Sequence, residues 1–271
     1  MPFYYIAILA LVQGISEFLP ISSSGHLVVT HYFLGDGETN LCWEKNRVLD
    51  VAVHLGTLLS ALLYFRNDIL SIGKKAIHPK SSDNSLLINI VIASLPIIVA
   101  GFILQYLKFD FLCSIKIMAW MTLIFGIILY IADRFKLDKT LDQMNKKDSL
   151  LIGLSQALAL IPGVSRSGVT MTTARFLGFS RIESARFSLL LSIIAISGAT
   201  VLTSVDIATE SLMNIGFEII VAIVLSFLSG YIAISLMMKW LSHASFTPFV
   251  IYRVILGIAL LTLIYGGFLT V

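Results

Sequence analysis

Eight ionisable side chains lie within the otherwise apolar segments of this chain, where a charge is costly and is usually kept for function. They are Glu17, His26, Asp50, His54, Arg166, Arg175, Arg186 and Arg253. Glu17 and His26 lie beside one abrupt break in the apolar pattern, and Arg166 lies in a second break. These three residues are therefore the main candidates for chemistry.

Each break combines a proline with a Ser-x-Ser-Gly sequence, at residues 20–25 and again at residues 162–168. A helix that begins after such a break presents free N–H groups and a partial positive charge, which favour an anion. Arg166 adds a planar fork of donors that matches phosphate oxygens. Further donors for a phosphate cradle are Ser22, Ser23, Ser24, Gly25, Ser165, Ser167, Gly168 and Thr170.

His26 has an ordinary pKa close to neutrality, which suits proton transfer or nucleophilic attack. Ser23 precedes it by three residues, a spacing that places both side chains on one face of a helical turn. Gln13 and Glu17 are four residues apart and share a face of the preceding segment. Their oxygen atoms suit either the orientation of His26 or the binding of a divalent cation.

Composition identifies the kind of protein in which these residues act. Of the 271 residues, 57% are hydrophobic and only 13% are charged, and the mean hydropathy is +0.92. An ordinary soluble domain carries about 25% charged residues, so soluble, disordered and disulfide-scaffold classes are excluded. The net charge of +3 is too small and too scattered to indicate nucleic-acid binding. Long continuous apolar runs favour spanning helices over the short alternating strands of a β-barrel.

The sequence predicts an all-α integral membrane protein with about ten helical segments. They are residues 3–19, 22–34, 49–65, 85–107, 113–132, 149–161, 167–178, 181–203, 214–240 and 247–269. Two of the pieces beside the breaks are shorter than the ~17 residues that a span needs. We therefore interpret the first and second segments, and the sixth and seventh, as re-entrant helix–loop–helix hairpins. The remaining six segments are predicted transmembrane helices.

Residues 13–35 align without gaps with residues 156–178, and eight of the 23 aligned positions are identical at an offset of 143. This similarity predicts an internal duplication within a single membrane domain of residues 1–271, with repeats at 1–135 and 149–271. Three spanning segments separate the hairpins, so the hairpins enter from opposite sides as an inverted-topology repeat. Their broken tips then meet near the midplane.

Loop charge predicts the orientation of the chain. Eleven lysines and arginines fall in loops on one predicted side, and four fall on the other. Because cytoplasmic loops carry the excess, both termini are expected to face outward, into the periplasm. Cys42 and Cys113 map to that outward side, and we expect them to be unpaired thiols.

Three of the eight ionisable residues have simpler explanations. Arg175 and Arg186 flank a short turn at residues 178–181, so we expect them to extend to the membrane interface. Asp50 begins its segment, where a negative charge is favourable in itself. For Asp50 a structural and a functional role stay equally open.

Three stretches resemble the signature motifs of the bacterial undecaprenyl pyrophosphate phosphatase, or bacitracin-resistance, family. Residues 13–26 read Gln-x-x-x-Glu-Phe-Leu-Pro-Ile-Ser-Ser-Ser-Gly-His, and residues 162–170 read Pro-Gly-Val-Ser-Arg-Ser-Gly-Val-Thr. Residues 245–253 read Ser-Phe-Thr-Pro-Phe-Val-Ile-Tyr-Arg. Together the stretches extend over most of the chain, and its length and segment order agree with the family.

The resemblance implies a bacterial inner-membrane hydrolase that converts undecaprenyl diphosphate into undecaprenyl phosphate and inorganic phosphate. The monophosphate is the carrier lipid of peptidoglycan synthesis, and hence of cell wall biogenesis. The resemblance also implies bacitracin resistance, because that antibiotic sequesters the diphosphate. The active site would be reached from the periplasmic side.

The resemblance also assigns roles to individual residues. Gln13 and Glu17 match a motif tied to a divalent cation, Ser23 matches the proposed nucleophile, His26 the essential histidine, and Arg166 the phosphate-binding arginine. Supporting polar positions are Ser22, Ser165, Ser167, Thr170 and Arg253. Gln13 stands where other members have Glu, which halves the number of carboxylates available to a Mg²⁺ or Ca²⁺ ion.

The sequence leaves several alternatives open. We favour attack by Ser23 with His26 as the base, and the variant has His26 as the nucleophile in a phosphohistidine mechanism. The rival function is a lipid-phosphate flippase or an anion transporter, since inverted repeats with broken helices also build transporters. His54 lies where the family varies between His and Gln, and it receives no role. Metal identity, prenyl chain length, a homodimeric state, and recycling versus new synthesis are not decided.

Overall fold

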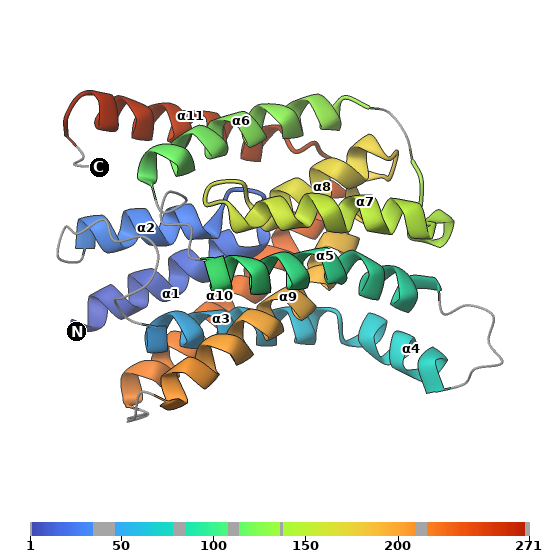
Figure 1. Cartoon of the computed structure of the whole chain (residues 1–271), viewed down its shortest axis with the longest axis horizontal. Coiled ribbons are helices and arrows are strands. Elements are labelled where there is room, and N and C mark those ends of the chain that lie inside the picture. Colours follow the sequence, from blue (N-terminus) through green and yellow to red (C-terminus); the bar gives the residue numbers. More distant parts are fainter. Residues whose placement is uncertain are drawn as a thin grey trace.

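The computed structural model describes residues 2–34, 47–77, 85–107, 114–135, 138–209 and 216–268, which are helical apart from turns and one backbone bridge. Figure 1 shows the eleven α-helices of these ranges. They are α1 (Phe3–Phe18), α2 (Ser23–Leu34), α3 (Arg47–Tyr64), α4 (Arg66–Ile77), α5 (Ser85–Leu107), α6 (Ile115–Asp133), α7 (Lys146–Ala157), α8 (Arg166–Phe176), α9 (Arg181–Thr209), α10 (Phe217–Leu241) and α11 (Thr247–Tyr265). Two short 3-10 helices, η2 (Leu141–Gln143) and η3 (Leu158–Leu160), flank α7.

Five of these helices, α5, α6, α9, α10 and α11, are long and apolar enough to cross a membrane. Helices α3 and α4 form a sixth candidate span that is bent by 70° between them. The predicted all-α membrane fold is thereby confirmed. Helix α4 has no counterpart among the predicted segments, because Arg66, Asp68, Lys74 and Lys75 interrupt its apolar pattern.

Two pairs of short helices form the predicted hairpins. Helices α1 and α2 have 16 and 12 residues, and α7 and α8 have 12 and 11, whereas a full span needs about 20. The first break separates Phe18 from Ser23. The second separates η3 from Arg166. Both breaks therefore fall where the Ser-x-Ser-Gly sequences predicted them.

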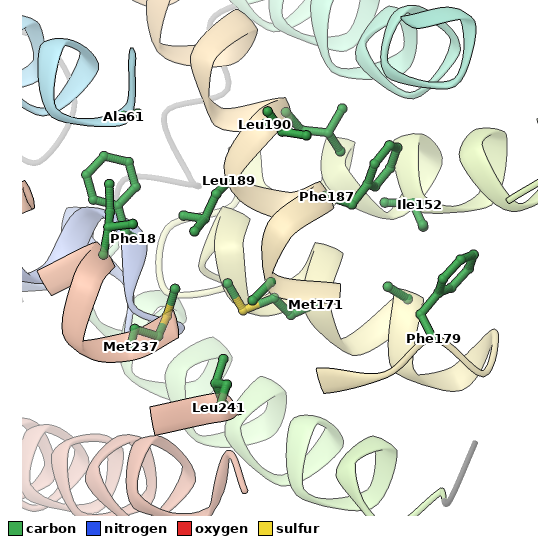
Figure 2. Close-up of a cluster of buried hydrophobic side chains, with 14 of the residues drawn as sticks. Phe18, Ala61, Ile152, Met171, Phe179, Phe187, Leu189, Leu190, Met237 and Leu241 are labelled. Carbon is green, nitrogen blue, oxygen red and sulfur yellow. The ribbon is translucent and has the colours of Figure 1, made fainter. Parts of the chain in front are cut away.

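Apolar side chains from several helices form a shared core beside the hairpins. Figure 2 shows Phe18 of α1, Met171 of α8, Leu189 of α9 and Met237 of α10 turned toward the same interior region. The core thus joins both hairpins to the long helices.

Small residues bring α10 close to both α1 and α3. A Cβ atom at Gly14 would lie 1.8 Å from the Ser229 Oγ atom, and one at Gly56 would lie 2.0 Å from the Ser226 Oγ atom. Close approach through small residues is a common way for membrane helices to associate. This packing sets the position of α1, and with it the position of Glu17 near its end.

The start of α1 and the end of α11 lie at the same end of the molecule, whereas α4 and the loop that precedes α7 lie at the opposite end (Figure 1). The odd number of crossings between two inverted hairpins predicts this arrangement. Asp50 lies in the first turn of α3, as expected, with its Oδ1 atom 3.6 Å from His31 Nε2. Cys42 and Cys113 lie outside the described residues.

Arg175 does not extend to the membrane interface, so that expectation is wrong. Its side chain is 4% exposed, its guanidinium donates to two backbone carbonyls, and Asp133 Oδ1 lies 3.8 Å away. Buried carbonyls need donors, and Arg175 satisfies them at the end of α8. Arg186 is more exposed and forms an ion pair with Asp68 of α4.

Candidate active site

Side chains from four helices, α1, α2, α3 and α8, form one polar cluster around Glu17. Its Oε1 atom accepts a hydrogen bond from Arg166 Nη2 of α8 at 2.9 Å. Its Oε2 atom accepts from Ser23 Oγ of α2 at 2.8 Å and from Gln13 Nε2 of α1 at 2.9 Å. His54 Nε2 of α3 lies 4.0 Å from the same oxygen. The structure therefore brings together Gln13, Glu17, Ser23 and Arg166, which the sequence had placed in one site.

Ser23 and Arg166 occupy equivalent positions in the two breaks. They are separated by the offset of 143 that aligns the two stretches, and each one begins a helix. Each also holds one oxygen of the same carboxylate. The residue equivalent to Glu17 is Leu160, so the two breaks converge on one acidic group rather than forming two copies of a site.

The backbone repeats the same unusual conformation in both breaks. Ser22 has φ 74° and Ser165 has φ 71°, and they are the positive-φ non-glycine residues of the described chain. Their hydroxyls contact the hydroxyl two residues later, Ser24 at 3.4 Å and Ser167 at 3.2 Å. Such conformations cost about 1–3 kcal/mol each and are often found at functional sites. A shared strained turn at equivalent positions is what an internal duplication predicts.

The predicted phosphate donors of the second break are buried and already have protein partners. Ser165 Oγ accepts a hydrogen bond from the Gly168 N–H at 3.1 Å and so caps α8. Ser167 Oγ donates to the Leu19 carbonyl of the first break at 2.9 Å. Thr170 Oγ1 lies 2.7 Å from a serine hydroxyl of α9. These contacts join the second break to the first break and to α9.

His26 has a partner at each ring nitrogen. Its Nδ1 atom lies 2.7 Å from the carbonyl oxygen of Ser22, which only accepts hydrogen bonds, so Nδ1 carries the proton. In the neutral ring Nε2 is then the acceptor, and it lies 2.5 Å from the hydroxyl of Tyr252 on α11. The structure therefore pairs Ser23 with Glu17 and pairs His26 with Tyr252.

Arg253 contacts both breaks and is completely buried. It donates to the carbonyl of Pro20 in the first break at 3.3 Å and to those of Gly163 and Val164 in the second at 2.9 and 3.1 Å. Pro20 and Gly163 are equivalent positions at the offset of 143. Arg253 thus holds the two loops together through their backbones, and its predicted contact with substrate stays a prediction.

Comparison with known proteins identifies the family to which this geometry belongs. A sequence model described as "Bacitracin resistance protein BacA" matches residues 6–259. The chain belongs to the BacA family. A relative from Hahella chejuensis, named undecaprenyl-diphosphatase, is 42% identical over 271 residues, which cover 98% of this chain and 99% of the relative. A relative of the same name from Pelagibacter ubique is 41% identical over 264 residues, which cover 96% and 97%.

Membership of the BacA family confirms the resemblance that rested on residues 13–26, 162–170 and 245–253. Two residues of this BacA-family site were not assigned from the sequence. Tyr252 was present in the third stretch, directly before Arg253, but its contact with His26 joins residues 226 apart. His54 received no role, because it lies where the family varies between His and Gln, and the structure places it beside Glu17.

Proposed function

We propose that this BacA-family protein is an undecaprenyl-diphosphate phosphatase, which releases inorganic phosphate and the monophosphate carrier lipid. The observation that supports this function most directly is the contact of Ser23 and Arg166, one from each break, with the carboxylate of Glu17. The names of the relatives support the same reaction. Removal of the diphosphate would confer bacitracin resistance, and the product would supply peptidoglycan synthesis.

Ser23 is the nucleophile of the proposed reaction, and Glu17 is its proton acceptor. The Ser23 hydroxyl already donates to Glu17 Oε2, so its proton moves to that oxygen as Oγ attacks the terminal phosphorus. The bond from this phosphorus to the bridging oxygen breaks, and undecaprenyl phosphate leaves with the electron pair. Water then attacks the phosphoserine and releases inorganic phosphate, while Ser23 regains a proton.

This proposal gives Glu17 the role of base that the sequence reasoning gave to His26. Catalytic hydrogen bonds often tighten only when substrate is bound, so His26 as base or as nucleophile stays an alternative. The substitution Ser23→Ala distinguishes the two nucleophiles, because His26 as nucleophile does not need the serine hydroxyl.

Arg166 stabilises the terminal phosphoryl group in the proposed mechanism. It begins α8, where free N–H groups already favour an anion, and its guanidinium has donors beyond the one that contacts Glu17. Charge that develops on the equatorial oxygens is stabilised by donors that are already in place. Ser22, Ser24 and Gly25 are the proposed further contacts at the N-terminus of α2, whereas the Gly168 N–H of α8 donates to Ser165 Oγ and would have to exchange that bond for the phosphate.

A divalent cation fits this site only if the substrate supplies part of its coordination. Gln13 is completely buried and its Oε1 atom has no hydrogen-bond partner among the described residues, so it offers one oxygen beside the carboxylate of Glu17. The described residues contain no group of three His, Cys, Asp or Glu side chains that could hold a metal. Mg²⁺ is commonly held by one or two protein groups together with phosphate oxygens. Gln13 and Glu17 would hold the ion, which would neutralise charge on the diphosphate.

The proposed location is the bacterial inner membrane, with both termini and the site opening on the periplasmic side. The excess of lysine and arginine in the loops at the opposite end supports this orientation. A reporter that is active only in the periplasm should be active after Val271 and silent between residues 133 and 149. The reverse pattern would contradict the orientation.

The direct test of the function is release of inorganic phosphate from undecaprenyl diphosphate by the purified protein in detergent. We expect turnover by the wild type and none above background by Ser23→Ala. A flippase or anion transporter with the same fold would release no phosphate. Absence of release from a folded wild-type protein, with and without Mg²⁺ or Ca²⁺, would therefore overturn the proposal.

A further inference from the structure

One ring nitrogen of His26 is available for chemistry, and in this structure it is covered. Nδ1 donates to the Ser22 carbonyl, so acid–base or nucleophilic chemistry at the neutral ring has to use Nε2. The Tyr252 hydroxyl donates to that nitrogen. The two rings are also nearly parallel, with centroids 5.4 Å apart and an interplanar angle of 11°.

Tyr252 belongs to the membrane-spanning helix α11, where it contacts His26 and is also partly exposed at the surface of the protein. Its side chain is 43% exposed, and on the same face of α11 Ile251 and Ile255 are 52% and 63% exposed. In a spanning helix such an exposed apolar face is the face that meets lipid. Arg253, the next residue, points to the other side and anchors α11 to both breaks. Arg253 therefore fixes the position of α11, and with it the position of Tyr252 relative to His26.

We propose that Tyr252 is a membrane-facing cover for His26, which a lipid-linked diphosphate displaces before Nε2 can act. Tyrosine suits this position because its ring is compatible with lipid and its hydroxyl needs a hydrogen-bond partner. A phosphate that arrives with its lipid chain in the membrane supplies a new partner for the hydroxyl. The kinetic consequence of the inference rests on the proposed phosphatase function, in the alternative in which His26 Nε2 acts as base or nucleophile. Its chemical consequence, the accessibility of Nε2, does not depend on that function.

The proposal predicts the direction of change in two measured quantities, the rate at which His26 is chemically modified and kcat/KM. A hydrogen bond that exists in the free enzyme and breaks before the reaction stabilises the ground state alone, so its removal raises kcat/KM. A hydrogen bond that keeps His26 in its working orientation would instead lower kcat/KM when it is removed. Tyr252→Phe keeps the ring and removes the hydroxyl, and therefore separates these two roles.

The chemical test is the rate at which diethyl pyrocarbonate modifies His26 in the full-length protein in detergent, followed by mass spectrometry of the peptide that contains it. In Tyr252→Phe we expect this rate to rise about fivefold, which corresponds to loss of one hydrogen bond of about 1 kcal/mol. Tyr252→Leu, which also removes the ring, should raise it further. The matched control is Tyr265→Phe, the same substitution at an exposed tyrosine that ends the same helix beside Lys116, which should leave the His26 rate unchanged.

The kinetic test is kcat/KM for a polyprenyl diphosphate, which should rise in Tyr252→Phe by up to the same factor of about five. An unchanged labelling rate of His26 in both Tyr252 variants would overturn the cover. A fall of kcat/KM in Tyr252→Phe would also overturn it, in favour of an orienting role. The labelling test does not need phosphatase activity, so it still decides the question if the wild type releases no phosphate.

Discussion

The two breaks share a backbone conformation but differ in how the protein surrounds them. In the first break Ser23 is partly exposed and Ser24 is exposed, and the α2 that follows is only partly covered. The equivalent of Ser24 in the second break, Ser167, is buried and donates to the Leu19 carbonyl, whereas Ser22 and its equivalent Ser165 are both buried. Both breaks reach Glu17, the first through a hydroxyl and the second through a guanidinium.

This difference indicates a division of roles between two similar loops. In the proposed mechanism the first loop, whose helix is less covered, carries the nucleophile Ser23, and it also carries His26. The second loop is packed against α9 and the first loop, and it presents one charged residue, Arg166, in a fixed position. In the proposed mechanism the first turn thus supplies the nucleophile, and the second supplies the group that stabilises the phosphoryl oxygens.

The largest effect is expected from removal of the reactive hydroxyl. Ser23→Ala should lower phosphate release by at least about 1000-fold, since loss of a nucleophile typically removes most of an enzyme's rate enhancement. Binding of the diphosphate lipid should survive, because the cradle of helix N-termini and Arg166 remains. Near wild-type turnover in Ser23→Ala would transfer the covalent role to His26.

A somewhat smaller effect is expected at the equivalent position of the second break. Arg166→Ala should insert into the membrane normally and hydrolyse diphosphate about 100- to 1000-fold more slowly, as for loss of one donor that stabilises the transition state. Arg166→Lys should recover little, because an ammonium keeps the charge but loses the planar fork. Phosphate release and the amount of folded protein are measured together.

The Arg166–Glu17 ion pair admits a purely structural alternative. In that case Arg166→Ala harms the protein by leaving a buried carboxylate without its ion-pair partner, and the added change Glu17→Gln should restore the amount of folded protein. If Arg166 acts on the substrate, Arg166→Ala is already fully folded but nearly inactive. A loss of folded protein in Arg166→Ala that the second change restores, or full turnover in Arg166→Lys, would show that Arg166 only supports the fold.

Much of the arrangement of the two breaks could be predicted from the sequence, whereas the remainder depends on contacts between residues that are far apart in the chain. The two breaks and their helices follow from local motifs and hydropathy, and the approach of Arg166 to Glu17 follows from the predicted meeting of the two hairpin tips. The pairing of His26 with Tyr252 does not, because α2 and α11 meet only in the folded bundle. The burial of Arg175 was mispredicted for the same reason, since its carbonyl partners include one 40 residues away.

A matched pair of glycines tests the packing difference directly. A Cβ atom at Gly25 of the first break would lie 3.4 Å or more from its nearest neighbours, whereas one at Gly168 would lie 2.7 Å from Arg253 Nη1 and 3.1 Å from Ser165 Cβ. Arg253 is fully hydrogen-bonded in place and has little room to yield. Gly168→Ala should therefore destabilise the protein by about 1–3 kcal/mol. Gly25→Ala should change stability by less than about 1 kcal/mol, and equal losses of thermal stability would contradict the comparison.

The smallest effect on stability is expected from substitutions that relieve the strained backbone at Ser22 or Ser165. Glycine adopts positive φ without a steric penalty, so Ser22→Gly removes strain from the first break and loses only a long hydroxyl contact to Ser24. Ser165→Gly removes similar strain but also loses the side-chain cap on Gly168 and the contact with Ser167.

We therefore expect Ser22→Gly to be more stable than Ser165→Gly by about 1 kcal/mol, or about 2–4 °C in Tm for a chain of this size. Thermal unfolding of the two variants in the same detergent measures the difference. Because each variant adds one glycine to the unfolded chain, that contribution cancels in the comparison. Equal values of Tm would mean that the cap of the second break contributes nothing, and that the two loops are equally well supported. A lower Tm for Ser22→Gly would place the more firmly held turn in the first break, which is the opposite of what the hydrogen bonds of the two serines indicate.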